Sequence, residues 1–303
     1  MFFPFRAQIT LFRLPWLTIL VSLLCVAVYV AQHFNHRTLE AGAWRFCEEQ
    51  NDRAFLAALK KLTQSAEAGA CVDLMLMLHH HDNTKAEIAR VIQLIPGSEQ
   101  QKAFHEQAVR ESYEAYRSAV PTSLTKRFWY PPESWNVFRM LSASVAHGGA
   151  GHLIGNLIFF FAFAAAVEML LGPILYLGVL IALALGTHTV YSLAMLGQSD
   201  APPTLGLSGV VMGIIALFTY FLPTARIRCF LWLIIFFRRF SLPAWLLALW
   251  YIGWDVYSQA TGSGDPGVNL VAHLSGVAIG LSIGVAFFRE KRHWAHDLVE
   301  EYS

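Results

Sequence analysis

Six long apolar runs, each close to the length of a membrane-crossing helix, are the feature that most restricts the fold of this chain. They cover residues 14–31, 153–171, 174–196, 205–222, 242–257 and 268–288. A helix needs about 20 predominantly apolar residues to cross the hydrocarbon core of a bilayer. Soluble domains are about a quarter charged, whereas 14% of these 303 residues are charged and 55% are hydrophobic. The sequence therefore predicts an all-α membrane protein, a bundle of six transmembrane helices.

Two apolar segments allow a second interpretation. The first run follows Arg6 and Arg13, as the apolar region of a signal peptide would, but no small-x-small cleavage site follows it. We therefore expect an uncleaved first span. Residues 229–237 form a seventh apolar run, which is too short to cross a bilayer and has arginines close to both ends. This run is expected to lie at the membrane interface.

The basic residues outside residues 32–132 predict the orientation of the chain in the membrane, because cytoplasmic loops are enriched in Lys and Arg. These residues form three clusters. Arg6 and Arg13 precede the first span, and Arg289, Lys291 and Arg292 follow the sixth. The third cluster lies between the fourth and fifth spans and contains Arg226, Arg228, Arg238 and Arg239. With six spans all three clusters fall on one side, and Arg139 is the exception. Both termini are therefore expected in the cytoplasm, and a bacterial inner membrane is the natural location for this layout.

The distribution of charge divides the chain into four expected segments. These are an N-terminal tail with the first span at 1–31, an outer helical insert at 32–132, a five-span core at 133–290 and a cytoplasmic tail at 291–303. More than half of all charged residues lie in the insert, with acidic and basic residues in equal number. The insert is therefore expected to be an extramembrane unit, which could recruit substrate, cover a site or bind a periplasmic partner.

The insert carries three local signals. A capping box at Thr84 and Glu87 predicts the start of a helix. Cys47 and Cys71 could form a disulfide in an oxidising outer compartment or remain two buried thiols, and the sequence favours neither. The polar run HHHD at 79–82 invites a metal-site interpretation, but it lacks distant ligands, and a solvated loop is the favoured interpretation.

Polar side chains within the spans are costly, and they are functional candidates by default. His152 and Asn156 lie four residues apart, and so on one helix face, at the start of the second span, and His147 lies just before it. Ser208 opens the fourth span, and His273 lies near the start of the sixth. Because these three spans run in the same direction, we expect the four intramembrane side chains at similar depth, roughly 5–10 Å below the outer surface.

Glycines beside these residues predict a close helix crossing. Gly276, Gly280 and Gly284 repeat every four residues after His273, and Gly209 and Gly213 follow Ser208. Small residues let two helix backbones approach closely. The fourth and sixth spans are therefore expected to pack together, which brings a hydroxyl beside an imidazole. The residues expected to shape this site are Gly206, Gly209, His147, Met212 and Gly276.

The residue types at this depth suit acyl transfer. A serine needs a general base to become a nucleophile, and His273 is the candidate base for Ser208. Asn156, His152 and the backbone N–H of Ser208 can donate hydrogen bonds to an oxyanion. No Asp or Glu accompanies His273 within its own span, which favours a dyad over a triad. Neither a metal nor a cofactor is expected.

Each of these residues alone has a simpler interpretation. A membrane serine such as Ser208 often hydrogen-bonds the preceding helical turn. His152 and Asn156 could join helices by hydrogen bonds, and His273 could relay protons or bind a metal. The glycines indicate packing in either case. The coincidence of depth and chemistry favours catalysis.

Taken together, these motifs resemble the rhomboid family of intramembrane serine proteases over residues 135–290. The resemblance rests on GLSG at 206–209, AHLSGVAIG at 272–280, the set of His147, His152 and Asn156, and VEMLLG at 167–172, which holds Glu168 and Gly172. It implies Ser208 as the nucleophile, His273 as the general base, and His152 with Asn156 in the oxyanion hole. It also implies cleavage, without a cofactor, of peptide bonds in or near transmembrane segments of other membrane proteins.

Several features depart from the family pattern or extend it. Phe138 and Arg139 stand where the family often has a Trp-Arg pair, and Met212 stands where many bacterial members have a tyrosine. The insert is longer than in the simplest members. The aromatic-rich stretch containing Trp250, Trp254 and Asp255 resembles the region where the family admits substrate laterally. A belt of interfacial aromatic residues is at least as good an interpretation of that stretch.

Three functions are compatible with the sequence. The leading hypothesis is an intramembrane serine protease with transmembrane protein substrates, a lipid bilayer as its environment and no nucleic-acid partner. The alternative is a catalytically inactive rhomboid-like protein that binds membrane clients, although such relatives usually lack the serine or the histidine. A transporter that uses His152, His188 and His273 is the third hypothesis. Transport predicts polar groups through the full membrane depth, whereas these imidazoles cluster towards the outer side.

Overall fold

The structure, a computed structural model, contains two compact units that are each described by themselves. It describes residues 2–7, 13–81, 83–198, 201–233, 236–262, 268–292 and 295. The first unit, called the core unit, comprises Met1–Tyr29 and Phe128–Ser303; the second, called the insert unit, comprises Val30–Arg127. Each unit has a hydrophobic core of its own. The fold is predominantly helical, as predicted.

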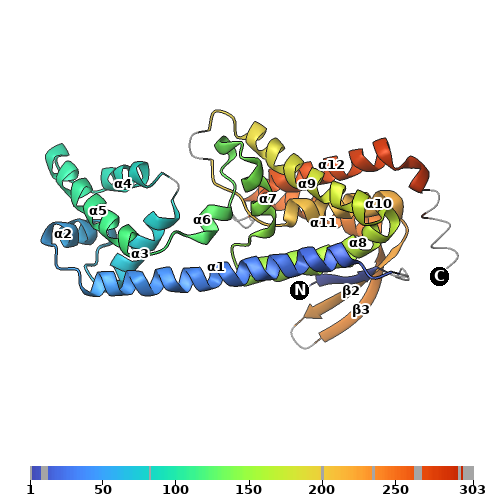
Figure 1. Cartoon of the computed structure of the whole chain (residues 1–303), viewed down its shortest axis with the longest axis horizontal. Helices are drawn as coiled ribbons and strands as arrows, with labels where there is room; N and C mark the ends of the chain where they lie inside the picture. Colours follow the sequence, from blue (N-terminus) through green and yellow to red (C-terminus); the bar gives the residue numbers. More distant parts are fainter. Residues whose placement is uncertain are drawn as a thin grey trace. The chain divides into compact units, whose positions relative to one another are not determined.

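The helices and strands follow one another along the chain as labelled in Figure 1. The long first helix α1 is Trp16–Glu48. The insert unit adds α2 (Arg53–Thr63), α3 (Ala68–His80), α4 (Thr84–Gln93), α5 (Glu99–Ala119) and α6 (Leu124–Phe128). The helices of the core unit are η1 (Pro132–Ser134), α7 (Val137–Val145), α8 (Ala150–Leu171), α9 (Pro173–Ala194), α10 (Ser208–Phe221), α11 (Ala244–Thr261) and α12 (Leu270–Phe287). Its strands are β1 (Phe2–Ala7), β2 (Arg226–Leu233) and β3 (Phe236–Pro243).

Four helices in the described part of the chain are long and apolar enough to cross a membrane, namely α1, α8, α9 and α12. The fifth apolar run of the sequence forms α11, and the fourth forms α10, which is shorter than predicted at 14 residues. Its shortness has a local cause at both ends. Gly206 has a φ of +125°, which no helical residue adopts, and Pro223 follows the last turn. The six-helix bundle is thus present, with one short central member.

The first helix does not end where the sequence analysis placed the boundary between span and insert. It continues as one helix to Glu48, and this stretch contains no proline that would interrupt it (Figure 1). The boundary expected between residues 31 and 32 therefore falls inside a continuous helix. The insert unit begins within α1, at Val30.

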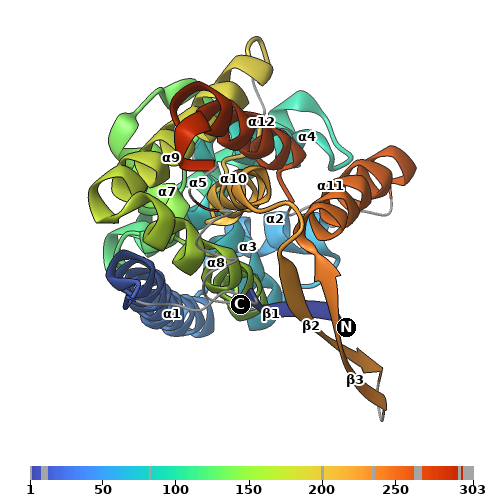
Figure 2. The same ribbon diagram turned by 90° about the vertical axis from the view of Figure 1, so that its right-hand side faces the viewer.

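The short helix α10 lies in the middle of the core unit. Figure 2 shows it surrounded by α7, α8, α9, α11 and α12, and it contacts all five. Most of its residues are buried, whereas the long helices around it expose apolar side chains on their outer faces. A helix that is apolar all round and buried belongs in the centre of a bundle. The position of α10 places Ser208, its first residue, inside the unit.

A three-stranded antiparallel sheet, in the order β1-β2-β3, contains the described residues of the short apolar run at 229–237. Residues alternate along β2, because Ile227 and Cys229 are buried in the core while Arg226 and Arg228 are exposed. This alternation has the period of a strand with one buried face. The apolar content of the run alone does not reveal this alternation, so the pairing of β2 with β3 was not predicted.

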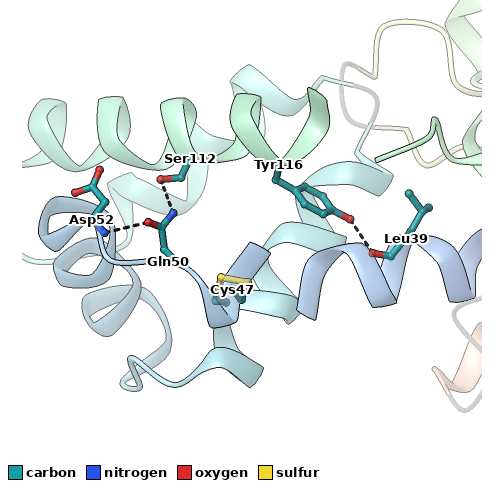
Figure 3. Close-up of a disulfide and its surroundings, with 7 residues drawn as sticks. Leu39, Cys47, Gln50, Asp52, Ser112 and Tyr116 are labelled. Atoms are coloured by element: carbon teal, nitrogen blue, oxygen red, sulfur yellow. Dashed lines mark hydrogen bonds between the residues drawn. A yellow bond between two sulfur atoms is a disulfide. The ribbon is translucent and has the colours of Figure 1, made fainter. Parts of the chain in front are cut away.

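The insert unit is a helical bundle stapled by the disulfide Cys47–Cys71, so the alternative of two free thiols is excluded (Figure 3). Phe55, Leu59 and Met75 are fully buried in its core. Figure 3 shows Tyr116 reaching from α5 to α1, where its hydroxyl donates to the carbonyl oxygen of Leu39 at 3.2 Å. Burial raises the pKa of Tyr116 to about 12, so its hydroxyl stays protonated as this donor.

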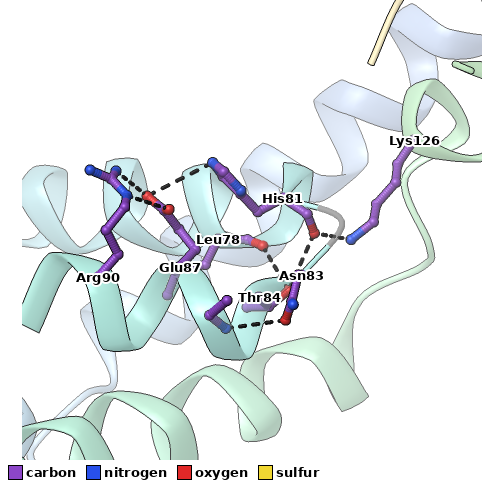
Figure 4. Close-up of polar contacts among 8 residues, drawn as sticks. Leu78, His81, Asn83, Thr84, Glu87, Arg90 and Lys126 are labelled. Atoms are coloured by element: carbon purple, nitrogen blue, oxygen red, sulfur yellow. Dashed lines mark hydrogen bonds and ion pairs between the residues drawn. The ribbon is translucent and has the colours of Figure 1, made fainter. Parts of the chain in front are cut away.

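Two local predictions in the insert unit were wrong. The cap of α4 is Asn83, whose side chain accepts from Ala86 N at 3.1 Å, and Glu87 pairs instead with Arg90, Nε to Oε2 at 2.7 Å (Figure 4). The run at 79–82 is not a solvated loop, because His79 and His80 end α3 and His79 is buried. Asp82 lies outside the described residues.

The two histidines at the end of α3 bond backbone rather than one another. His79 Nε2 lies 3.2 Å from the Pro121 carbonyl oxygen, and His80 Nδ1 lies 2.7 Å from the carbonyl oxygen of Leu76. Burial lowers the pKa of His79, so its imidazole is neutral at neutral pH. These contacts give both rings a structural role at the end of the helix.

Candidate active site

Ser208 is the first residue of α10, and the segment before it has a fixed conformation. Gly206 N donates to the carbonyl oxygen of Ala143 at 2.8 Å, which holds the segment against α7. The φ of +125° at Gly206 is a region that side-chain-bearing residues rarely adopt. The half-buried Ser208 is therefore positioned by a turn that needs glycine two residues earlier.

A second anchor holds the same segment two residues further upstream, at Thr204. Tyr130 and Thr204 exchange two backbone hydrogen bonds, of 2.8 and 2.9 Å. Asn269, the N-cap of α12, donates from Nδ2 to Thr204 Oγ1 at 3.1 Å. The segment leading to Ser208 is thereby tied to the start of the helix that carries His273. The roles of Tyr130, Thr204 and Asn269 could not be predicted from the sequence, because no local pattern marks a contact between residues so far apart in the chain.

The helices α10 and α12 meet backbone to backbone at their glycines, as their spacing predicted. A methyl group on Gly276 would overlap the carbonyl oxygen of Gly209, and one on Gly280 would overlap that of Gly213. A Cβ on Gly209 would lie 3.1 Å from the carbonyl oxygen of Ala272. Gly209 follows Ser208 and Ala272 precedes His273, so the first turns of the two helices lie side by side (Figure 2).

His273 is in the first turn of α12, where Asn269 caps the helix by accepting from Ala272 N at 3.0 Å. Its ring makes one polar side-chain contact that the sequence analysis did not foresee: Nδ1 lies 2.7 Å from Asp255 Oδ2. Asp255 belongs to α11, so no acid lies within the span of His273 itself, as the sequence indicated. The carboxylate that contacts the ring comes from a neighbouring helix, which the sequence did not predict.

No hydrogen bond joins the Ser208 hydroxyl to the His273 ring among the residues that the structure describes. Hydrogen bonds between a nucleophile and its base are often long in the absence of substrate and shorten only in the reacting complex. The geometry therefore brings the two residues into neighbouring helical turns without forming the bond.

His152 lies over the turn that precedes Ser208. A Cβ on Gly206 would lie 2.6 Å from His152 Cε1 and 2.8 Å from its Nε2, so the imidazole fills the space that the missing side chain leaves. His152 is in the first turn of α8 and is half-buried. Asn156, one turn further, is buried and donates from Nδ2 to the carbonyl oxygen of His152 at 2.9 Å.

The His147 ring packs against the His152 ring. The two imidazoles meet edge to face, with centroids 5.3 Å apart. Burial, aided by His152, lowers the pKa of His147 to about 4, so its ring is neutral at neutral pH. Nδ1 lies 3.3 Å from the carbonyl oxygen of Val145 and must carry the proton, since a carbonyl oxygen only accepts.

The start of α10 also provides backbone donors. The first hydrogen bond within the helix runs from Val211 N to the carbonyl oxygen of Leu207, at 2.9 Å. The N–H groups of Ser208, Gly209 and Val210 precede it and lie at the positive end of the helix dipole. A negatively charged oxygen near Ser208 would therefore meet backbone donors.

The other sequence candidates occupy different places. Met212 is buried among the apolar residues of α10, and Phe138 on α7 is 83% exposed. His188 is buried in α9, where its Nδ1 lies 2.6 Å from the carbonyl oxygen of Ala184. The outer face of α11 carries a hollow of about 420 Å³, which is lined by Leu246, Leu249, Trp250, Gly253, Trp254 and Tyr257. Trp250 and Trp254 stack there, with ring centroids 6.4 Å apart.

The comparisons with known proteins identify a family for this part of the chain. The family model described as Rhomboid domain matches residues 134–290, which is more than half of the chain and includes Ser208 and His273. No curated protein matches the chain. Members of the rhomboid family are generally intramembrane serine proteases, which act on transmembrane substrates within the bilayer. This chain is therefore a multi-pass integral membrane protein of the rhomboid family.

Proposed function

We propose that this protein is an active intramembrane serine endopeptidase in which Ser208 is the nucleophile and His273 the general base. The observation that carries the proposal is the backbone contact between α10 and α12 at Gly209 and Ala272, next to the two residues. A base must come within hydrogen-bonding reach of its nucleophile, and small residues let the two helical turns that carry Ser208 and His273 approach closely.

The proposed reaction begins with attack of Ser208 Oγ on the carbonyl carbon of the scissile peptide bond. The hydroxyl proton passes to His273 Nε2, and the carbonyl oxygen becomes an oxyanion. As the tetrahedral intermediate collapses, the carbon–nitrogen bond breaks and the leaving amine takes the proton from His273. Water then attacks the acyl-enzyme with His273 again as the base, which releases the new carboxyl end and restores Ser208.

The oxyanion is expected to accept hydrogen bonds from His152, Asn156 and the backbone N–H of Ser208. The position of the His152 ring over Gly206 supports this role, because it places an imidazole two residues before the nucleophile. One N–H of Asn156 already bonds the His152 carbonyl oxygen, so the second N–H of the same amide is the one assigned to the oxyanion. Such preorganised donors typically contribute about 3 kcal/mol each to transition-state stabilisation.

The residues assigned to shaping the site act on these groups. Gly206 lets the His152 ring lie against the turn before Ser208, Gly209 lets α10 approach Ala272 of α12, and Gly276 lets α12 approach α10. The His147 ring contacts the His152 ring edge to face. Met212 fills the core one turn after the nucleophile. No step of this mechanism calls on a cofactor or a metal.

Substrates are expected to be transmembrane segments of other proteins, reaching the site along α11. The hollow on the outer face of α11 supports this route, since Trp250, Trp254 and Tyr257 form an apolar surface there of the kind that a lipid-embedded segment contacts. A bacterial inner membrane with both termini in the cytoplasm would place the insert unit outside. The Cys47–Cys71 disulfide supports that orientation, because disulfides persist in oxidising compartments.

Labelling of the full chain in lipid with a fluorophosphonate probe tests the proposal. We expect the parent protein to be labelled, and Ser208→Ala and His273→Ala to lose labelling, because only an activated serine forms the phosphonate ester. Ser275→Ala is the matched control, since Ser275 lies two residues after His273 and its hydroxyl bonds the carbonyl oxygen of Ala272. It should label as the parent does.

Equal labelling of parent and Ser208→Ala would contradict the proposal, as would no labelling of a folded parent. Either result would favour the alternative, a catalytically inactive member of the family that binds membrane clients. In that case the insert unit, which could bind a periplasmic partner, would become the first region to examine for client binding.

A further inference from the structure

The hydrogen bond between Asp255 and His273 is the strongest polar contact near the proposed site that the mechanism has not used. Asp255 Oδ2 lies 2.7 Å from His273 Nδ1, and the two side chains are only 19% and 12% exposed. A pair at this distance and this burial is a charge-assisted hydrogen bond when the imidazole is protonated. It joins α11 to the first turn of α12, beside the turn that carries Ser208.

The chemistry of imidazole makes the choice of nitrogen significant. A carboxylate only accepts hydrogen bonds, so His273 Nδ1 carries the proton towards Asp255. In the neutral ring the other nitrogen, Nε2, then holds the lone pair that a general base needs. Nε2 lies on the opposite edge of the ring from Asp255. The contact therefore sets the tautomer that can take a proton from a serine.

We propose that Asp255 is a positioning residue for catalysis, which holds His273 in the reactive tautomer and stabilises the imidazolium that forms when Ser208 gives up its proton. The proposal rests on the proposed function and extends the dyad to an arrangement of three residues drawn from α10, α11 and α12. No proton reaches Asp255 in this scheme, since the proton moves only from Ser208 Oγ to His273 Nε2 and on to the leaving amine.

The alternative is a structural pair that merely fastens α11 to α12. The two roles differ in what they require of the acid. A structural hydrogen bond can be replaced by any acceptor of similar shape, whereas stabilisation of an imidazolium needs the negative charge. A set of variants that removes charge and acceptor separately therefore distinguishes the two roles.

The variants are Asp255→Asn, which keeps an acceptor without the charge, Asp255→Leu, which removes both, and Asp255→Glu, which keeps both. Ser258→Ala is the matched control, because Ser258 lies on the same helix and its hydroxyl bonds only the Asp255 carbonyl oxygen among the described contacts. The readout is the rate of reaction of the full chain in lipid with a fluorophosphonate probe, resolved into a maximal rate and a half-saturating probe concentration.

We expect the maximal rate to fall about 100-fold or more for Asp255→Leu, with an intermediate loss for Asp255→Asn. The half-saturating concentration should stay within about twofold of the parent value, because Asp255 touches neither probe nor nucleophile. Asp255→Glu should recover most of the rate, and Ser258→Ala should react as the parent does. Parent-like maximal rates for Asp255→Asn and Asp255→Leu, with Ser208→Ala unreactive, would overturn the positioning role and leave the proposed function intact.

A second measurement does not depend on reactivity. Nitrogen NMR of histidine-labelled protein, with the His273 signal identified by its loss in His273→Ala, reports which ring nitrogen carries the proton. We expect the proton on Nδ1 in the parent, and its redistribution towards Nε2 in Asp255→Leu. A parent with the proton on Nε2 would overturn the positioning role. An unreactive parent with the proton on Nδ1 would instead show that the proposed function fails while the pair still sets the tautomer.

Discussion

At the scale of single residues, Gly206 connects the backbone of the nucleophile turn to the proposed oxyanion hole. Two separate features require glycine at this position: its φ is +125°, and the His152 ring fills the space that a side chain would occupy. Neither demand comes from the hydrophobic core. A substitution here should therefore affect the site more than the fold.

Gly206→Ala tests this at the residue scale. A left-handed backbone with a side chain costs about 1–3 kcal/mol, and the added methyl group would displace His152 from its position near Ser208. We expect fluorophosphonate reactivity to fall about 100-fold, as it does when an oxyanion donor is lost. Gly178→Ala is the control, because a Cβ at Gly178 meets nothing within 4 Å and its φ is ordinary. Parent-like reactivity of Gly206→Ala would remove His152 from the oxyanion hole.

At the scale of helices and strands, the sequence predicted elements whose pattern is local and missed those made by distant contacts. The glycine repeat in α12 predicted its contact with α10 because small residues at helical spacing have few other uses in a membrane. The carboxylate partner of His273 could not be predicted, since Asp255 lies on another helix and has no sequence relation to the histidine. The pairing of β2 with β3 was not predicted, because only the apolar content of the run was considered. Apolar content alone fits an interfacial segment as well as a strand, and the alternation of buried and exposed residues is what indicates a strand.

A further contact at this scale fixes the start of α1. Glu168, buried on α8, accepts hydrogen bonds from Leu17 N at 2.9 Å, and from Thr18 N and Thr18 Oγ1 at 2.8 Å each. Thr18 Oγ1 also lies 3.1 Å from the Tyr176 hydroxyl of α9. Backbone N–H groups at a helix start lack partners within the helix, and a carboxylate is the best acceptor for them. Glu168 thus joins α1, α8 and α9 at the end of the bundle opposite to the start of α8.

Glu168→Ala should destabilise the core unit by about 2 kcal/mol, because it leaves buried donors of α1 without their acceptor. Thermal unfolding of the purified protein in detergent measures the effect as a lower transition temperature. The control is Glu133→Ala, an exposed acid of the same unit, which should change stability by less than about 0.5 kcal/mol. Equal effects of the two variants would show that the contacts of Glu168 contribute no more than an ordinary surface charge.

At the scale of the whole molecule, the chain consists of two units with separate cores and separate means of stabilisation. The core unit relies on helix packing around α10, whereas the insert unit adds a disulfide to its small apolar core. Stabilisation of one unit should then be separable from that of the other. All proposed catalytic residues belong to the core unit, so the proposed activity should not require the disulfide.

Replacement of Cys47 and Cys71 together by Ser tests this separation. The disulfide closes a loop with a sequence separation of 24 residues, and a crosslink of that size stabilises by about 3 kcal/mol in the chain-entropy description. Hydrogen exchange followed by mass spectrometry should show faster exchange in α2, α3 and α5, with α10 and α12 unchanged. Fluorophosphonate reactivity should also stay at the parent level.

Cys25→Ala is the control, because Cys25 is a buried free thiol of the core unit and its loss should leave hydrogen exchange in the insert unit unchanged. If removal of the disulfide alone abolished fluorophosphonate reactivity, the prediction would be wrong. The reactivity of Ser208 and His273 would then depend on the structure of the insert unit, although neither residue belongs to its core.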